Sequence, residues 1–240
     1  MEEDLRQLGV ISFLVIYQRV SYMKRKSVAL SMTEIVIPLK SEHVKNVVDV
    51  HLQSFRGFFL TFLGREFLSE LYRGIVTDPS GIAFVAVAYE RVVGFVAGTD
   101  HPAGFYKRLL GKRWWRFGLA SLPAIIKKPQ VVLRLFRALS MPTQVTAENG
   151  RGTLMSIAVL PGEQNKGIGH LLTKAFLEEA RKRGLQQVDL TTDKLNNDSV
   201  NAFYLREGFY LTRNFETPER REMNEYMIDL PGNKFNEQPI

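Results

Sequence analysis

Residues 154–184 read LMSIAVLPGEQNKGIGHLLTKAFLEEARKRG and carry the pattern that decides the fold. The run from Leu154 to Leu160 is β-prone and is broken at Pro161-Gly162. Beyond a loop with two further glycines, apolar residues recur at helical spacing and predict a helix over residues 167–183. These apolar residues are Ile168, Leu171, Leu172, Ala175, Phe176 and Ala180. The segment therefore predicts a strand, a glycine loop and a helix.

The glycine loop suits the binding of a phosphate group. The first turn of a helix has unpaired N–H groups and the positive end of the helix dipole, so it stabilises an anion. Gly167 and Gly169 lack a Cβ atom and would let the backbone approach the phosphate, and Lys166 adds a positive charge. The alternative is an ordinary strand–helix connection whose glycines only make the turn. A P-loop is excluded because Ile168 follows Gly167, and a GxGxxG fingerprint is absent from this loop.

Two motifs resemble those of the GNAT superfamily of N-acetyltransferases. Gln164 to Gly169 matches the acetyl-CoA loop of that family, Gln/Arg-x-x-Gly-x-Gly/Ala, at every fixed position. Asn197 to Phe209 resembles its second motif, Asn-x-x-Ala-x-x-(Leu/Phe)-Tyr-x-x-x-Gly-Phe, with Val200 in the usual alanine place. On the order and spacing of the two motifs, the chain is identified as a member of this family. The resemblance implies a mixed α/β (α+β mixed sheet) fold, that of an acyl-CoA N-acyltransferase.

The elements predicted from periodicity follow the order that this family implies, over about residues 33–230. Strands are predicted over 34–39, 82–89, 92–99, 154–160, 187–192, 209–215 and 223–230, and helices over about 44–55, 63–76, 167–183 and 199–206. Pro38 is expected at a sheet edge, and Ser41 is expected to cap the first helix. Residues 1–32 are predicted to be an extension outside this domain, and residues 231–240 a frayed tail.

The ends and the composition exclude several classes of protein. The apolar run from Val10 to Tyr17 is shorter than the ~20 residues that a membrane span needs. Three interpretations of residues 1–32 stay open: a loose extension, sequence upstream of a start at Met23 or Met32, or an interfacial anchor. With no cysteine there are no disulfides, thiolate zinc sites or cysteine nucleophiles, and four scattered histidines predict no metal site.

The positive net charge belongs to one insert, residues 100–150, between the third and fourth predicted strands. From His101 to Ala147 there are nine Lys or Arg residues and no Asp or Glu, whereas the rest of the chain holds 23 basic and 25 acidic residues. The insert predicts one amphipathic helix from Phe105 and a second from Pro129. Three interpretations stay open for residues 105–139: a helical hairpin packed on the domain, peripheral contact with an anionic membrane, or binding of acceptor phosphate or nucleic acid. No RNA-binding signature is present, so nucleic acid comes last.

The family resemblance implies roles for individual residues. The backbone groups of Ile157, Ala158 and Val159 would bind the pantetheine arm and polarise the thioester carbonyl at a strand bulge. Tyr204 would protonate the leaving thiolate, and Asn197 would contact the pantetheine arm or cap its helix. The family places a Glu near Thr153 in some members, so the general base stays open among His51, Asp100, His101, Glu148 and a water chain. The residues that would surround the diphosphate are Gln164, Asn165, Lys166, Gly167, Ile168, Gly169 and His170.

These observations predict an acetyl-CoA-dependent N-acetyltransferase that moves the acetyl group directly to a primary amine. The absence of cysteine fits direct transfer without an acyl-enzyme. The basic insert favours a small-molecule acceptor, such as an amino sugar of polysaccharide synthesis. A protein or peptide N-acetyltransferase and a non-catalytic acyl-CoA-binding module that docks on a membrane are the alternatives. A cytoplasmic enzyme, with peripheral contact at the inner face of the membrane, is the expected location.

Overall fold

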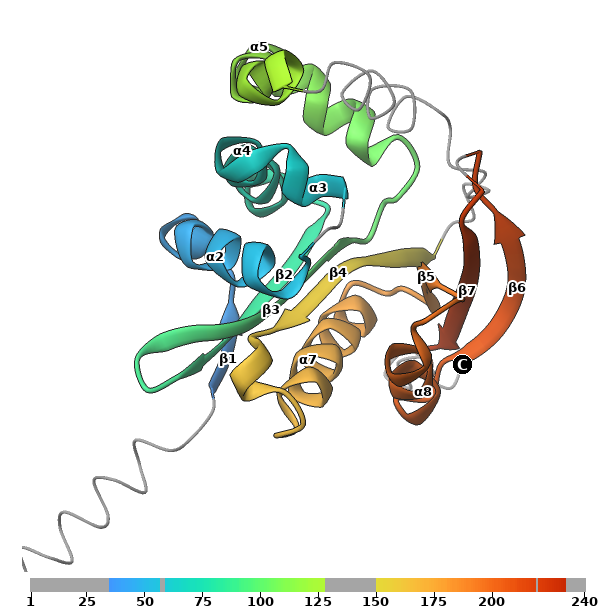
Figure 1. Cartoon of the computed structure of the whole chain (residues 1–240). Helices are drawn as coiled ribbons and strands as arrows, with labels where there is room; N and C mark the ends of the chain where they lie inside the picture. Colours follow the sequence, from blue (N-terminus) through green and yellow to red (C-terminus); the bar gives the residue numbers. More distant parts are fainter. Residues whose placement is uncertain (1–34, 57–58, 128–149, 219, 232–240) are drawn as a thin grey trace, which may run out of the picture.

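The computed structural model describes residues 35–56, 59–127, 150–218 and 220–231. Within these ranges the chain forms helices and strands in mixed order (Figure 1). The elements are β1 (Ile35–Pro38), η1 (Ser41–His43), α2 (Val44–Ser54), α3 (Phe59–Phe62), α4 (Gly64–Thr77), β2 (Gly81–Ala88), β3 (Arg91–Thr99), α5 (Phe105–Lys127), β4 (Arg151–Val159), η2 (Pro161–Glu163), α7 (Ile168–Lys182), β5 (Gln187–Asp193), α8 (Asp198–Arg206), β6 (Tyr210–Glu216) and β7 (Glu222–Asp229).

The described strands form one sheet in the order β1-β2-β3-β4-β5-β7-β6. β4 and β5 run parallel, and every other neighbouring pair is antiparallel. Pro38 lies in the edge strand β1, where its missing N–H leaves no gap in the sheet interior. The mixed α/β fold predicted from the sequence is confirmed.

Helices cover both faces of the sheet, and each face encloses its own buried cluster. α2, α4 and α5 lie on one side, and α7 and α8 lie on the other (Figure 1). Tyr72 and Phe95 are fully buried in the cluster under α2, α4 and α5. Leu172 and Phe176 are fully buried in the cluster between α7 and the sheet. Each such side chain contributes about 1.5–3 kcal/mol of burial free energy, which holds the helices in place.

The predicted helix starts agree with the observed ones to within one residue, but the predicted cap of the first helix does not form. Ser41 does not cap α2, because a 3-10 turn precedes that helix and the capping position falls on His43, with no side-chain cap. The helix predicted over about residues 63–76 is α4, and the φ of +87° at its first residue, Gly64, marks the break from the short α3. The predicted β2–β3 hairpin is present. Its turn residues Tyr89 and Glu90 have φ of +51° and +60°, as two-residue hairpin loops require.

The first helix of the insert packs on the domain through its apolar face. A Cβ added to Gly74 of α4 would lie 2.7 Å from Leu109 Cδ1, so this glycine lets α5 approach closely. Phe105, Leu109 and Phe117 of α5 are buried there. The helix predicted from Pro129 lies outside the described residues, as does the segment 1–32. Among the helices described, none combines the length and the apolar character needed to span a bilayer.

Candidate active site

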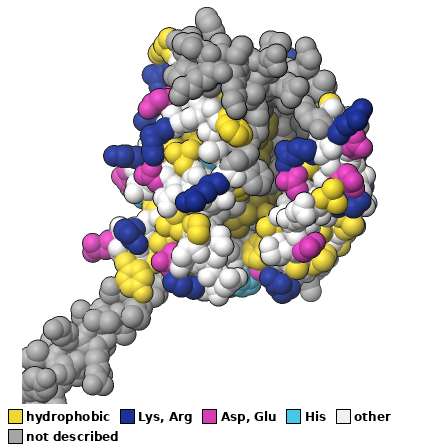
Figure 2. Space-filling view, in the orientation of Figure 1, with side chains coloured by type: hydrophobic (Ala, Val, Ile, Leu, Met, Phe, Trp, Pro, Cys, Tyr) yellow, Lys and Arg dark blue, Asp and Glu magenta, His cyan; other side chains and the backbone are white. Residues whose placement is uncertain are grey.

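The sheet opens where its two parallel strands, β4 and β5, separate; we call this opening the split. β4 and β5 pair only from Arg151–Gln187 to Thr153–Asp189 and then separate. Beyond Thr153, β4 therefore pairs with β3 on one side only within the described part of the chain. In the space-filling view the surface is hollowed beside this split, between α7 and the side that carries α8, β6 and β7, and hydrophobic side chains line the hollow (Figure 2). A ligand can enter here without displacing a strand.

A bulge in β4, and the alternating direction of its backbone N–H and C=O groups, determine which of these groups face the split. The register with β3 shifts between Ala97 and Gly98, which leaves Met155 as the extra residue of a bulge. Leu160 N donates to Val93 O at 2.8 Å, so the backbone groups of every second residue from there face β3. Those of Val159 and Ile157 then face the split. Val159 O confirms this direction, because it accepts from Ser54 Oγ and Gln164 Nε2, each at 3.2 Å.

Ala158, the third residue expected to contact the pantetheine arm, is placed differently. It pairs with Phe95 in the β3–β4 ladder, and its side chain is buried in the cluster under α2 and α4. By the same alternation its N–H and C=O face β3 rather than the split. Ile157 and Val159 are therefore the residues of this trio whose backbone groups can reach a ligand.

The glycine loop brings the first turn of α7 to the mouth of the split. Asn165 has φ of +62° and Gly167 φ of +87°, so the chain reverses through two left-handed residues before the helix starts at Ile168. Among the residues that the structure describes, no side chain caps this helix start. Its first N–H groups thus remain available for an anion. A Cβ on Gly169 would lie 3.2 Å from the Phe203 ring, so this glycine allows α7 to approach α8.

The charged residues of the loop already have partners within the chain. Lys166 Nζ lies 2.7 Å from Glu163 Oε2. His170 Nδ1 lies 2.9 Å from Glu207 Oε2, which links the first turn of α7 to the end of α8. Both side chains are half or more exposed, and pairs of this kind contribute little to stability, so an arriving phosphate can compete for them.

Tyr204 is buried in the cluster between α7 and the sheet rather than on the surface of α8. It is 6% exposed and packs edge-on against Phe203 and Phe209 with ring centroids 5.3 and 5.8 Å away. Its hydroxyl finds no hydrogen-bond partner in the described part of the chain. Burial raises the pKa of Tyr204, so the phenol keeps its proton across the working pH range. The group is therefore a proton donor with no internal acceptor.

Asn197 stands at the N-cap position of α8, but its side chain does not cap the helix. Its Nδ2 donates to Thr192 Oγ1 at 2.7 Å and to Asp193 O at 3.0 Å, both at the end of β5. Asn201, one turn later, donates to the same carbonyl at 3.1 Å. The amides thus tie α8 to the end of β5, and of the two roles left open for Asn197 the side-chain helix cap does not form.

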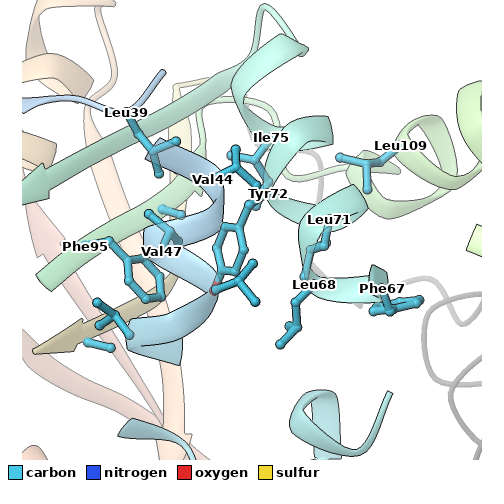
Figure 3. Close-up of a cluster of buried hydrophobic side chains, with 14 of the residues drawn as sticks. Leu39, Val44, Val47, Phe67, Leu68, Leu71, Tyr72, Ile75, Phe95 and Leu109 are labelled. Carbon is cyan, nitrogen blue, oxygen red and sulfur yellow. The ribbon is translucent and has the colours of Figure 1, made fainter. Parts of the chain in front are cut away.

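His51, one of the residues left open as the general base, lies in the core of the domain. His51 is buried, its Nδ1 lies 2.7 Å from the Tyr72 hydroxyl, and burial lowers its pKa to about 4. Tyr72 itself lies among apolar side chains, close to Phe95 (Figure 3). Asp100 is held by Arg183 at 2.8 Å, and Glu148 lies outside the described residues. His101, the third described candidate, is exposed just after β3, and its backbone N–H donates to Thr99 Oγ1 at 3.1 Å.

Sequence analysis missed the polar pair at the point where the strands separate. Thr153 Oγ1 donates to Asp189 Oδ1 at 2.6 Å, whereas Asp189 Oδ2 is buried without a hydrogen-bond partner. Burial raises the pKa of Asp189, although Thr153 and the nearby Arg151 favour its charged form. The available signal was an acidic residue between Val188 and Leu190 in a β-prone run, an unusual place for a carboxylate. In the described part of the chain, no cluster of His, Asp or Glu suited to a metal is present.

The sequence matches the model of the acetyltransferase (GNAT) family over residues 47–209. No curated protein matches it significantly. Solved structures match by fold at low identity. The ribosomal-protein-S18-alanine N-acetyltransferase of Escherichia coli is 13% identical, with a TM-score of 0.53, and the match covers 85% of this chain and 98% of that one.

Two further structures of similar fold have the same low identity. The Drosophila melanogaster polyamine N-acetyltransferase, which catalyses the formation of N-acetylagmatine, is 13% identical with a TM-score of 0.53, covering 82% of this chain and 100% of that one. The PaiA N-acetyltransferase of Thermoplasma acidophilum, solved with coenzyme A, is 13% identical with a TM-score of 0.50, covering 81% and 98%.

Proposed function

Because the chain belongs to the acetyltransferase (GNAT) family and is an acyltransferase, we propose that it carries acetyl-CoA in the β4–β5 split and acetylates a small primary amine there. The observation that supports the proposal most is the combination of that split with an uncapped α7 N-terminus at its mouth. A coenzyme with an anionic diphosphate and an extended amide arm matches both features.

In this proposal the diphosphate lies on the first turn of α7. The N–H groups there and the backbone at Gly167 bind the phosphate oxygens, with Lys166 and His170 as charged neighbours. The pantetheine arm runs along the open edge of β4 and bonds the backbone of Val159 and Ile157 as an added strand would. Gln164, bonded to Val159 O at 3.2 Å, holds the loop against that edge.

The reaction follows from where the arm ends. The amine nitrogen attacks the thioester carbonyl carbon, the C–N bond forms, and the C–S bond then breaks. The thiolate takes a proton from the Tyr204 hydroxyl, and the proton that leaves the new amide nitrogen restores the phenol. One proton of the original ammonium is released to solvent. Because the phenol is less acidic than a thiol, its position beside the sulfur matters more than its acidity.

The acceptor is proposed to be an amino sugar attached to a phosphate-bearing carrier. The support is electrostatic. α5 lies on the same face of the sheet as α2 and α4 and carries basic residues and no acidic residue. Like charges disfavour an acceptor with several positive charges, whereas a carrier phosphate would be attracted. A protein N-terminus is the alternative, and the peptide in the panel below represents it.

The function is tested by thiol release from acetyl-CoA with UDP-glucosamine, glucosamine, agmatine and a peptide that begins with alanine. We expect heat of CoA binding by calorimetry and turnover that is fastest with UDP-glucosamine. Gly167→Val should weaken CoA binding about 10-fold or more, because a β-branched residue is strained at a φ of +87°. Tight CoA binding without turnover of any amine would instead support a non-catalytic module.

Contact of α5 with an anionic membrane surface is proposed as a second property. Trp115 and Leu119 are exposed on α5, and the Arg116 guanidinium lies 5.0 Å from the Trp115 ring. An aromatic ring beside basic groups is typical of an interfacial helix. Two of its arginines also have partners in the protein: Arg116 lies 3.8 Å from Glu70, and Arg108 donates to the His101 carbonyl at 2.8 Å.

Co-sedimentation with vesicles of anionic phospholipid checks the membrane contact. Changing Lys112, Arg113 and Arg116 together to Glu should abolish binding, because each basic residue contributes about 1 kcal/mol at an anionic surface. The matched control changes the exposed Lys174, Arg181 and Lys182 of α7, on the other face of the sheet, and should leave binding unaltered. Equal loss in both variants would show an effect of net charge and contradict the proposal.

A further inference from the structure

Thr153 and Asp189, the last paired residues of β4 and β5, form a hydrogen-bonded pair at the base of the split. Asp189 is 4% exposed, its Oδ1 accepts from Thr153 at 2.6 Å, and its Oδ2 is buried with no partner. A buried carboxylate with an unbonded oxygen is costly to the fold. Thr153, which donates to this carboxylate, is only partly buried and so is the more accessible member of the pair. The geometry is a carboxylate that can be reached through a hydroxyl.

The pair lies close to the reactive end of the proposed coenzyme. The diphosphate loop adjoins the Val159 end of β4, so the thioester at the other end of the arm points back along β4 toward the Met155 bulge. Thr153 is two residues from that bulge, about 7 Å at strand spacing. In this arrangement the acceptor amine would lie between a thioester at the bulge and the Thr153 hydroxyl.

The pair also faces a different side of the sheet from the coenzyme loop. Leu154 packs in the cluster under α7, so its neighbour Thr153 points to the face that carries α2, α4 and α5. Asp189 is the pairing partner of Thr153 and lies on the same face. Acceptor and coenzyme can therefore approach the split from opposite faces, as direct transfer in a ternary complex requires.

We propose that Thr153 and Asp189 form the relay that deprotonates the acceptor ammonium. This inference rests on the proposed function. The ammonium gives one proton to Thr153 Oγ1, which passes its own proton to Asp189, so the carboxylate becomes a carboxylic acid. The neutral amine then attacks the thioester, and Asp189 returns the proton to solvent after product leaves. Thr153 contacts the amine, and Asp189 acts through it as the positioning residue.

The groups around Asp189 set how readily it takes the proton. Burial raises its pKa, which makes it a better base than an exposed aspartate, while Thr153, Arg151 and Arg213 oppose that shift and Glu225 supports it. Arg213 and Glu225 pair with each other across β6 and β7. With the relay at work, activity should fall as the pH drops through the raised pKa of Asp189, because the carboxylate is then protonated and accepts no further proton.

The relay is tested by pH profiles of kcat/KM for the fastest amine of the panel. Thr153→Val and Asp189→Asn should each lower kcat/KM about 100-fold at pH 7, and the double variant no further, since the two residues act as a unit. Thr153→Ser should stay within about 5-fold, because it keeps the hydroxyl. The loss should shrink as the pH approaches the pKa of the free amine, which then deprotonates without help. Asp193→Asn, the same change on the same strand in an exposed pair with Arg221, is the control.

Two results would overturn the relay while leaving the enzyme intact. One is a wild-type rate and pH profile in Asp189→Asn. The other is a loss of equal size at every pH, which would indicate a structural role. Coenzyme binding measured by calorimetry should be unchanged in both single variants, so a loss of CoA affinity also counts against the relay.

If no amine in the panel is turned over, the proposed function is contradicted. A stability measurement still tests the protonation of Asp189 that the relay needs. The raised pKa means that folded Asp189 holds its proton more tightly than the unfolded chain does. Wild-type stability therefore falls as the pH rises from about 3.9 through the folded pKa. Asp189→Asn should have the higher Tm at pH 7 and lose that advantage near pH 4. The opposite result is a Tm of Asp189→Asn that lies below the wild-type Tm at pH 7 and equals it at pH 4. It would show that the charged Asp189 stabilises the fold as an ion-pair partner, and it would contradict the relay.

Discussion

Replacing Tyr204 with phenylalanine is expected to lower kcat about 100-fold or more while leaving CoA affinity nearly unchanged. The variant keeps the ring that packs against Phe203 and Phe209 and removes only the hydroxyl. Without it, the thiolate must leave unprotonated or wait for water, which raises the barrier of the C–S cleavage. Steady-state kinetics with acetyl-CoA and calorimetry with CoA measure the two quantities separately.

Tyr226→Phe is the matched control for this experiment. Its ring lies 6.1 Å from that of Tyr204, but its hydroxyl donates to Asn201 Oδ1 at 3.0 Å. Losing that bond should cost about 1 kcal/mol of stability and leave kcat close to wild type. The raised pKa of Tyr204 also predicts no alkaline fall in rate from this group below pH ~10. An unchanged kcat in Tyr204→Phe would remove Tyr204 from the role of acid.

Gly98→Ala is expected to be the most destabilising small substitution near the site. A Cβ at this position would lie 2.1 Å from Thr153 O and 2.8 Å from two ring atoms of Phe176. The carbonyl belongs to the backbone of β4, so relief requires the strand itself to move. We expect the free energy of unfolding to fall by about 3 kcal/mol, and Tm to fall by roughly 6–12 °C.

Thermal and denaturant unfolding of the purified variant measure this effect. Gly111→Ala is the control, because an added Cβ there meets no atom within 4 Å and the residue lies in α5. In a helix this change should stabilise by about 0.5–1 kcal/mol. A Gly98→Ala protein as stable as wild type would show that β3 and β4 can separate locally. The position of Thr153 would then not depend on the close approach of β3 and β4 at Gly98.

The local elements of the site were predictable because they depend on near neighbours in the chain. The loop before α7 needs left-handed residues and a free helix start, and Gly167 and the apolar periodicity of the following helix signal both. The β2–β3 hairpin follows from two β-prone runs with a very short link. Ser41 failed as a cap because a turn of 3-10 helix formed ahead of α2, and propensity does not resolve one turn.

The pairing that makes the proposed relay could not be predicted in the same way. Thr153 and Asp189 are 36 residues apart, and only the register of two parallel strands brings their side chains together. Neither residue is unusual by type. In the sequence, Thr153 only marks a position near which some members of the family have a glutamate, and Asp189 is a single polar residue in a predicted strand. The direction of the backbone at Ala158 likewise depends on which residues bond to β3.

By itself, the sequence determined the family, the order of helices and strands and the glycine loop that precedes α7, because periodicity, glycine placement and motif spacing are local properties of a chain. Only the tertiary structure decided where β4 and β5 separate, which backbone groups of β4 are left to a ligand, and which carboxylate stands behind Thr153. Those features arise from contacts between segments far apart in the chain, whose geometry is set by strand register and by helices packing through single glycines such as Gly74 and Gly98.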